Sequence, residues 1–133
     1  PGKPILFAKF KSKEKVFFGL PGNPISSAAC FRFFVYPFLS TILNINEENP
    51  FKARLKNKFV KKKNFTRFLK GKLTSTNNGN LQIEILQGQE SYRVKSFVKS
   101  NVWGVFKAGQ SIFKKKQLIE CHFSIASNKN IFY

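Results

Sequence analysis

The chain has 133 residues and a mass of 15.3 kDa, the size of one ordinary domain or two very small ones. It carries 24 Lys and Arg residues against six Glu and no Asp, so its formal net charge is +18. The lack of Asp excludes an Asp-based triad, an aspartic dyad and an Asp-rich calcium loop within the chain, while the positive field favours anions such as nucleic acid, acidic lipid or phosphorylated small molecules.

Two short strands and one helix are expected in the first third of the chain. Apolar runs at 4–10 and 16–20 predict strands joined by a polar turn. The sequence PGNP at 21–24 then begins a helix, because Asn is a favoured N-cap and Pro is favoured at the first helical position. Apolar residues recur at helical spacing, so we predict one helix over 24–43 that is kinked at Pro37.

The rest of the chain reads as a small β domain. A polar segment at 44–50 ends in proline, so we divide the chain into domains at 1–45 and 46–133. The sequence NNGN at 77–80 tolerates positive φ and predicts a hairpin. Strands are expected at 51–59, 66–74, 81–86, 92–98, 102–106 and 117–125. The predicted fold class is α+β: the end of an α/β layer, with two strands and one helix, followed by a small antiparallel β-barrel or sandwich.

The turn at 19–27 (GLPGNPISS) is the clearest candidate binding site. It joins a strand, a rigid turn and a helix N-terminus, whose unsatisfied N–H groups and positive dipole end suit an anion. Gly22 allows close approach to the backbone, and Ser26 and Ser27 add hydroxyl donors. The same residues are equally those of a helix cap on a stiff turn, and the physics of the sequence leaves both interpretations open.

Other features have simpler interpretations. Two lysine runs, at 61–63 and 114–116, read as solvated loops or, functionally, as a rim that steers anions or a nucleic-acid patch. Trp103 and most of the Phe residues fit a core, with a stacking platform for single-stranded nucleic acid as the alternative. The two cysteines lie far apart without C-x-x-C spacing, so we expect reduced thiols and no metal site. No stretch approaches the ~20 apolar residues of a membrane span.

The N-terminal motifs resemble MoeA, the molybdopterin molybdotransferase family that includes the C-terminal half of gephyrin. The resemblance rests on PGKP at 1–4, GLPGNPIS at 19–26 and the late Pro37 in the helix, in that order and spacing. Looser similarity follows in the β part. FLKG at 68–71 resembles a Phe-x-Arg-Gly strand, and QG at 87–88 resembles a Gln-Gly-Ser turn.

This resemblance implies an activity and partners. It implies that 1–45 ends an α/β molybdopterin-binding domain and that 46–133 is a C-terminal β domain like MoeA domain IV. The implied reaction is insertion of molybdate into adenylated molybdopterin, assisted by Mg²⁺, by a cytoplasmic homodimeric transferase. The Mg²⁺ ligands would lie upstream of Pro1, so we expect a C-terminal piece that is inactive alone. Nucleic acid is then not expected as a partner, nor is a membrane, and a basic β-barrel nucleic-acid-binding module or a scaffolding fragment without activity are the alternatives.

The resemblance also assigns roles to single residues. Lys70 matches a base of the family's active cleft and is the catalytic candidate, although Arg is usual there and Lys lacks its bidentate fork. Gln89 stands where the serine of the turn is expected. The substrate-binding candidates are Lys3, Pro21, Gly22, Asn23, Pro24, Ser26, Gly88 and Gln89. No metal ligand is assigned.

Overall fold

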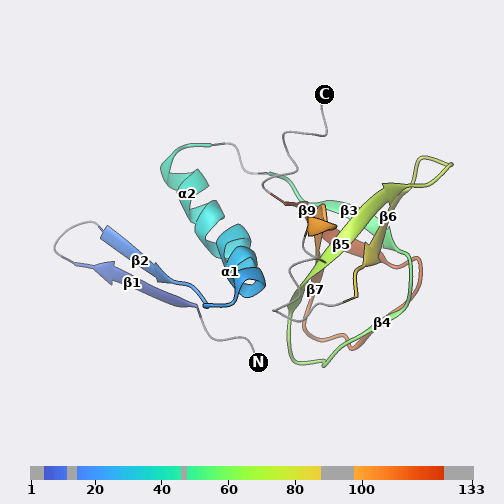
Figure 1. Cartoon of the computed structure of the whole chain (residues 1–133), viewed down its shortest axis with the longest axis horizontal. Coiled ribbons are helices and arrows are strands. Elements are labelled where there is room, and N and C mark those ends of the chain that lie inside the picture. Colours follow the sequence, from blue (N-terminus) through green and yellow to red (C-terminus); the bar gives the residue numbers. More distant parts are fainter. Residues whose placement is uncertain (1–4, 12–14, 46–47, 88–97, 125–133) are drawn as a thin grey trace. The chain divides into compact units, whose positions relative to one another are not determined.

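The computed structural model describes residues 5–11, 15–45, 48–87 and 98–124 (Figure 1). The chain divides into two compact units, at 1–47 and 48–133. The boundary that we predicted after residue 45 falls close to this division.

The N-terminal unit begins with a two-stranded antiparallel sheet. Strand β1 (Leu6–Phe10) pairs with β2 (Lys15–Gly19), as the two apolar runs predicted. The rings of Phe7 and Phe18, one from each strand, lie 5.1 Å apart between centroids. The ring of Phe38 lies 6.2 Å from the first and 5.3 Å from the second. These edge and tilted contacts hold the helical part of the unit against one face of the sheet.

A continuous helical run follows, with a wide turn at its centre. It comprises α1 (Pro24–Cys30), the π-helical turn η1 (Phe31–Val35) and α2 (Tyr36–Ile42). The N–H of Tyr36 donates to the carbonyl five residues before it, which defines the π-turn. A proline cannot donate to the carbonyl four residues earlier and clashes with it, and a π-turn widens the helix at that point. We predicted a kink at Pro37; the irregularity that the structure has is this π-turn, which ends at Val35.

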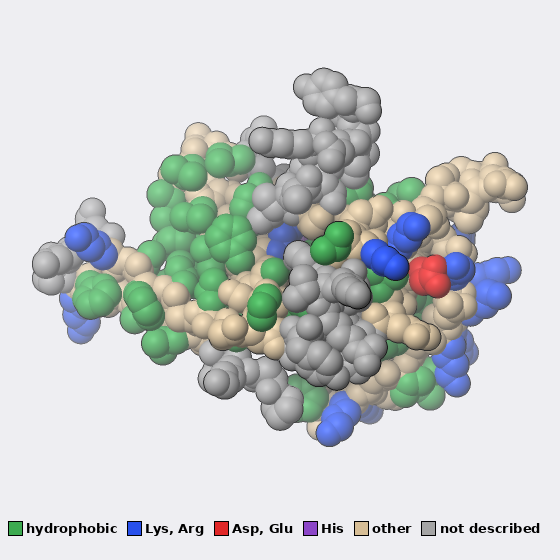
Figure 2. Space-filling model, in the orientation of Figure 1, with side chains coloured by type: hydrophobic (Ala, Val, Ile, Leu, Met, Phe, Trp, Pro, Cys, Tyr) green, Lys and Arg blue, Asp and Glu red, His purple; other side chains and the backbone are tan. Residues whose placement is uncertain are grey.

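Much of the apolar surface of the N-terminal unit is uncovered. Figure 2 shows hydrophobic side chains gathered over the helical part of the chain. The large apolar residues that are more than a third exposed here are Leu6, Phe7, Phe10, Val16, Phe17, Leu20, Phe31, Phe34, Leu39, Ile42, Leu43 and Ile45. The run Pro24–Ile42 is also long and apolar enough to cross a membrane, so the expectation that no stretch approaches that length was wrong. Length and composition alone are weak evidence for a span, because core helices and signal sequences meet the same criteria.

The C-terminal unit is a closed barrel of five strands in the order β3-β6-β5-β7-β9 (Figure 1). These strands are β3 (Phe51–Leu55), β5 (Arg67–Ser75), β6 (Leu81–Ile85), β7 (Val102–Phe106) and β9 (Leu118–Phe123). Strands β3 and β6 run parallel, whereas every other neighbouring pair is antiparallel. The predicted barrel is thus confirmed, with one parallel pair where we expected only antiparallel ones.

Two of the predicted strand ranges are not matched by a single described strand. The strand expected over 51–59 ends at Leu55, and a second, two-residue strand β4 (Phe59–Val60) pairs with β8 (Ile112–Phe113) as a separate ribbon. The strand expected at 92–98 lies outside the described residues except for its last position. The predicted hairpin is present between β5 and β6, where Gly79 has a φ of +74°.

The barrel core is centred on Ile83, whose side chain is fully buried. A Cβ added at Gly71 would lie 2.8 Å from the Ile83 side chain, and one added at Gly104 would lie 3.0 Å from it. The two glycines, Gly71 on the adjacent strand β5 and Gly104 on β7, therefore make room for the Ile83 side chain. The buried cluster around it consists of Ala53, Leu55, Leu69, Val102, Phe106, Phe113, Ile119 and Cys121.

Both cysteines are free, as predicted. Burial raises the pKa of the Cys121 thiol to about 12, and it also raises the pKa of Cys30. Both groups are therefore protonated at neutral pH, where a thiol is a weak nucleophile.

Candidate functional site

The turn before α1 holds a group of the predicted substrate-binding residues. The Asn23 side-chain oxygen accepts the backbone N–H groups of Ile25, at 3.1 Å, and Ser26, at 3.2 Å. Asn23 has extended φ and ψ, and Pro24 opens the helix, so the helix-cap interpretation is confirmed. The cap already uses two of the first free N–H groups of the helix. A ligand at this turn would instead meet the exposed backbone of Gly22, where an added Cβ would have no atom within 4 Å.

Lys70, the catalytic candidate, lies on the outer face of the barrel. Its neighbours on β5, Leu69 and Gly71, face the core, so its own side chain points the other way. Strand register places Lys70 opposite Trp103 on β7, and Trp103 opposite His122 on β9. Lys70 is 0% exposed and Trp103 is 3% exposed. The three side chains thus form a row across adjacent strands, outside the barrel core and yet buried at Lys70 and Trp103.

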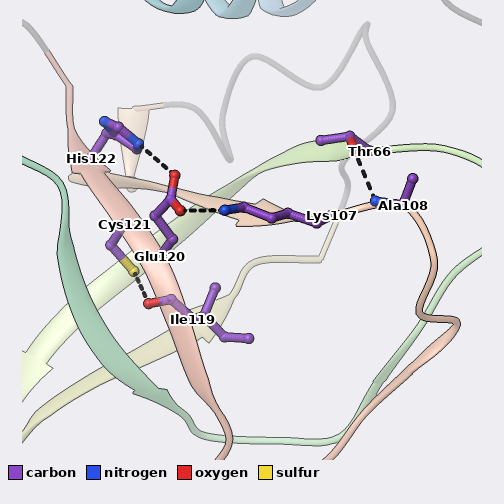
Figure 3. A network of polar contacts seen from close by, with 7 residues as sticks. All are labelled: Thr66, Lys107, Ala108, Ile119, Glu120, Cys121 and His122. Carbon is purple, nitrogen blue, oxygen red and sulfur yellow. Dashed lines mark hydrogen bonds and ion pairs between the residues drawn. The ribbon is translucent and has the colours of Figure 1, made fainter.

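A carboxylate lies beside His122, the last member of this row (Figure 3). Glu120 precedes His122 by two residues, so both side chains project from the same face of β9. The Nζ of Lys107 lies 2.8 Å from one Glu120 oxygen, and the Nε2 of His122 lies 3.3 Å from the other. The hydrogen bond from Lys107 is the main cause that holds the pKa of Glu120 below its usual range. Glu120 is therefore ionised at neutral pH and is shared between a cation and an imidazole.

The loop that carries Lys107 is anchored close to this cluster. The N–H of Ala108 donates to the Thr66 hydroxyl oxygen over 3.0 Å, which ties the end of β7 to the start of β5 (Figure 3). Within the described residues no three His, Cys, Asp or Glu side chains gather as a metal site. The cluster can hold a proton or orient a charge, but it does not supply a cation site of its own.

The ion pair at Glu120 predicts how stability depends on pH. A carboxyl group with a lowered pKa in the folded state stabilises the fold above its unfolded pKa, and this stabilisation is lost as the pH falls through the folded value. We therefore expect Glu120→Gln to lower the free energy of unfolding at pH 7 and to matter less at a strongly acidic pH, below the lowered pKa of the folded state, where the wild-type carboxyl is itself protonated. Urea denaturation at both pH values measures this difference. An equal loss at both would contradict the role of the charge.

The lysine run at 61–63 is not uniform. Lys61 is only 6% exposed, and its Nζ donates to the backbone carbonyls of Lys62, Phe65 and Gln110 at 3.2, 2.7 and 2.8 Å. It also lies 5.5 Å from the centroid of the Phe113 ring. Lys61 is therefore buried and fits none of the roles predicted for the run, which were a solvated loop, an anion-steering rim and a nucleic-acid patch. Its ammonium joins two loop segments. Lys62 and Lys63, the other two residues of the run, are exposed.

The structure places the predicted site residues in different units. Pro21, Gly22, Asn23, Pro24 and Ser26 share the turn of the N-terminal unit, whereas Lys70 belongs to the C-terminal one. Lys3, Gly88 and Gln89 lie outside the described residues. The sequence did not identify the outer-face row or Glu120. The alternation of β9, which sets Glu120 and His122 on one face, was the signal available for them.

The comparisons with known proteins indicate one family. Residues 52–121 match the family described as MoeA C-terminal region (domain IV). The "Molybdenum cofactor synthesis protein cinnamon" of Drosophila melanogaster is 32% identical over 114 residues, which are 77% of this chain and 17% of that protein. The "Molybdopterin molybdenumtransferase" of Synechococcus elongatus is 31% identical over 110 residues, 83% of this chain and 26% of that protein. This chain therefore spans about a quarter or less of the relatives it matches.

Solved structures show the same similarity. A molybdopterin biosynthesis MoeA protein from Pyrococcus horikosii superposes with a TM-score of 0.68 at 27% identity, over 92% of this chain and 29% of that one. A molybdenum cofactor biosynthesis protein from Pyrococcus furiosus gives a TM-score of 0.66 at 16% identity, over 91% of this chain and 41% of that one. At that identity the second likeness concerns the fold alone.

Proposed function

Because this chain belongs to the MoeA family through its C-terminal region, we propose that it forms the end of a molybdopterin molybdotransferase. The whole protein would insert molybdenum during molybdenum cofactor biosynthesis. The observation that carries this proposal is the family match over 52–121, which begins in β3 and ends in β9 and so covers the closed barrel. Nothing in the matches favours a basic nucleic-acid-binding module.

The proposal gives each part of the chain a role. The turn before α1 would face adenylated molybdopterin, and residues 46–133 would form the C-terminal β domain. Molybdate is the second substrate. Mg²⁺ does not fit the described residues, because they contain no group of three metal-ligating side chains. Its ligands would come from other parts of a cytoplasmic homodimer.

The residues of this chain would act by position and charge. The turn is stiff, because prolines stand on both sides of Gly22 and Asn23 and the cap fixes the start of the helix. A stiff turn with an exposed backbone can hold an anionic substrate without an ordering cost. Lys70 would add a positive charge as a point source, since its ammonium lacks the fork with which Arg grips an oxyanion. Electrostatic stabilisation of this kind acts most strongly where water is excluded.

The test is molybdenum insertion by the full-length protein, measured for Lys70→Met and for Lys72→Met. Lys72 lies on the same face of β5 and is exposed, so it matches the change in charge at an accessible position. We expect Lys70→Met to lower insertion by at least about tenfold and Lys72→Met to leave it within about twofold. Lys70→Arg, which keeps the charge and restores the base usual in the family, should retain most activity.

Two outcomes would contradict the proposal. Insertion that is absent in the full-length wild-type protein would contradict the function itself. If both Met variants were equally active, with the fold intact by circular dichroism, Lys70 would have no role in the reaction, although the function of the whole protein would stand. The isolated chain 1–133 should show no insertion, because it spans only about a quarter of its relatives.

A further inference from the structure

The β4–β8 ribbon presents a basic surface with an aliphatic centre that the proposed function does not use. We propose that this ribbon docks an acidic polypeptide segment in extended conformation, with one aliphatic side chain between its carboxylates. The partner is a protein that carries such a segment. The proposal concerns the C-terminal unit alone and does not depend on the activity of the whole protein.

The outer face of the ribbon is defined by alternation. Val60 pairs with Ile112 in register, and these side chains are 59% and 47% exposed. Their neighbours Phe59 and Phe113 turn inward, where both rings contact Phe106 at centroid distances of 5.0 and 4.8 Å. The pairing extends beyond the two strands, because the N–H of residue 61 donates to the carbonyl of residue 111 over 2.9 Å. Side chains two residues from the aliphatic pair therefore share its face.

Those positions are occupied by lysines. Lys58 and Lys62 flank Val60 along one strand, and Lys114 follows Ile112 on the other; all three are exposed. Lys63, Lys115 and Lys116 lie beside them and are also exposed. None of these six ammonium groups has an ion-pair partner in the described part of the chain. The result is an aliphatic pair within a ring of uncompensated positive charge.

The described acids of the same unit do not neutralise this ring. Glu84 lies 2.7 Å from Lys56, Glu120 lies 2.8 Å from Lys107, and Glu48 accepts the N–H of Phe123, so all three are engaged elsewhere. Figure 2 shows basic side chains over the barrel part of the visible face, with little acidic surface among them. An anionic partner therefore meets no competing carboxylate on the ribbon from the part of the chain that the structure describes.

The surface is held in shape before any partner arrives. The buried Lys61 ammonium bridges the carbonyls of Phe65 and Gln110, one from each side of the ribbon. The side chains of Gln110 and Gln117 bond to each other, and the N–H of Lys114 donates to the Gln117 side-chain oxygen over 2.9 Å. Preorganisation of this kind lowers the ordering cost of association.

The chemistry of the ribbon favours an acidic polypeptide over other anions. Side chains on one face of an extended chain recur about every 7 Å, and the ribbon repeats at the same spacing because both are strands. Carboxylates on either side of one aliphatic residue would meet the lysines while that residue covers Val60 and Ile112. An apolar centre within a charged rim is the usual anatomy of a protein interface. Nucleic acid would find no aromatic face in the centre, and a second basic ribbon would repel the first.

The test measures fluorescence anisotropy of a labelled peptide with the full-length protein. The probe has about nine residues. Glu occupies every second position except the central one, which is Leu, and Ser fills the remaining positions, so that the pattern matches the period of an extended strand. The control peptide has the same composition with Leu moved to one end. We expect the ordered probe to bind at least about fivefold more tightly than the control, because only it places carboxylates on both sides of the aliphatic residue.

Matched variants separate the ribbon from the general charge of the protein. Lys58→Gln/Lys62→Gln/Lys114→Gln should weaken binding by at least about tenfold, because it removes the flanking charges. The same three-charge loss at exposed sites elsewhere, Lys52→Gln/Lys72→Gln/Lys99→Gln, should weaken it by less than about threefold. Val60→Ser/Ile112→Ser should weaken it several-fold and leave its salt dependence unchanged.

Each contrary result overturns the proposal. Equal losses in the two triple variants would mean nonspecific attraction. If Val60→Ser/Ile112→Ser had no effect, or if both peptides bound equally, the aliphatic pair would take no part in binding. Tighter ribbon-dependent binding to an RNA oligonucleotide or to phosphatidylserine vesicles would assign the surface to that anion instead, and ribbon-dependent self-association would assign it to a second copy.

Discussion

Replacing Ile83 with Ala is expected to lower the free energy of unfolding of the barrel by about 3–4 kcal/mol. The side chain is fully buried, and it packs against the backbones of Gly71 on β5 and Gly104 on β7. Its removal leaves a cavity that these strands can fill only by shifting the barrel. Urea denaturation measures the loss. Leu81→Ala, on the same strand with a side chain 39% exposed, is the control and should cost less than about 1 kcal/mol.

A second substitution tests the same packing from the opposite side. Gly71→Ala places a methyl group 2.8 Å from the Ile83 side chain, so by itself it should cost about 1–3 kcal/mol. In the double variant Gly71→Ala/Ile83→Ala the new methyl group enters the space that Ile83 leaves. The double loss should therefore be smaller than the sum of the single losses. Strict additivity would mean that the two positions do not share the space we describe.

Replacing Lys61 with Met should lower the free energy of unfolding by about 2–3 kcal/mol, although lysine is a residue that usually lies at the surface. The three carbonyls that its ammonium satisfies would lose their donor, and the link between residue 65 and residue 110 would be lost. Lys62→Met is the matched control, because Lys62 is exposed and next in the chain. Chemical denaturation of both variants measures the contrast. Similar small losses in both would mean that water replaces the ammonium.

Local rules in the sequence predicted much of the fold. The NNGN turn produced the β5–β6 hairpin because Gly79 takes a positive φ there. The short strand predicted at 102–106 has the bounds of β7, and PGNP began the helix where the cap and the proline required. These predictions succeeded because each depends on residues close together in the chain.

Predictions that depended on distant residues were less complete. The parallel pairing of β3 with β6 follows from barrel closure, which no short pattern encodes. Lys61 and Lys62 look alike in sequence, and only the approach of the 110–113 segment buries the first of them. The ion pair between Lys107 and Glu120 likewise joins residues that lie apart in the chain, one on the loop after β7 and one on β9.

The candidate site shows the same division. Sequence alone identified the turn at 21–26 and its cap, because those interactions are local. It placed Lys70 on a strand, but the burial of Lys70 and its alignment with Trp103 and His122 depend on the register of three strands. Whether the turn holds a substrate is a question of chemistry rather than of fold.

The most direct measurement is binding of molybdopterin or its adenylate to the full-length protein, comparing wild type with Pro21→Ala/Pro24→Ala. Pro50→Ala, an exposed proline outside the turn, is the control. We predict that the double variant raises Kd by at least about tenfold with the fold intact by circular dichroism, because a loosened turn must be ordered on binding. Unchanged binding in that variant would contradict the account and leave the turn as a helix cap alone.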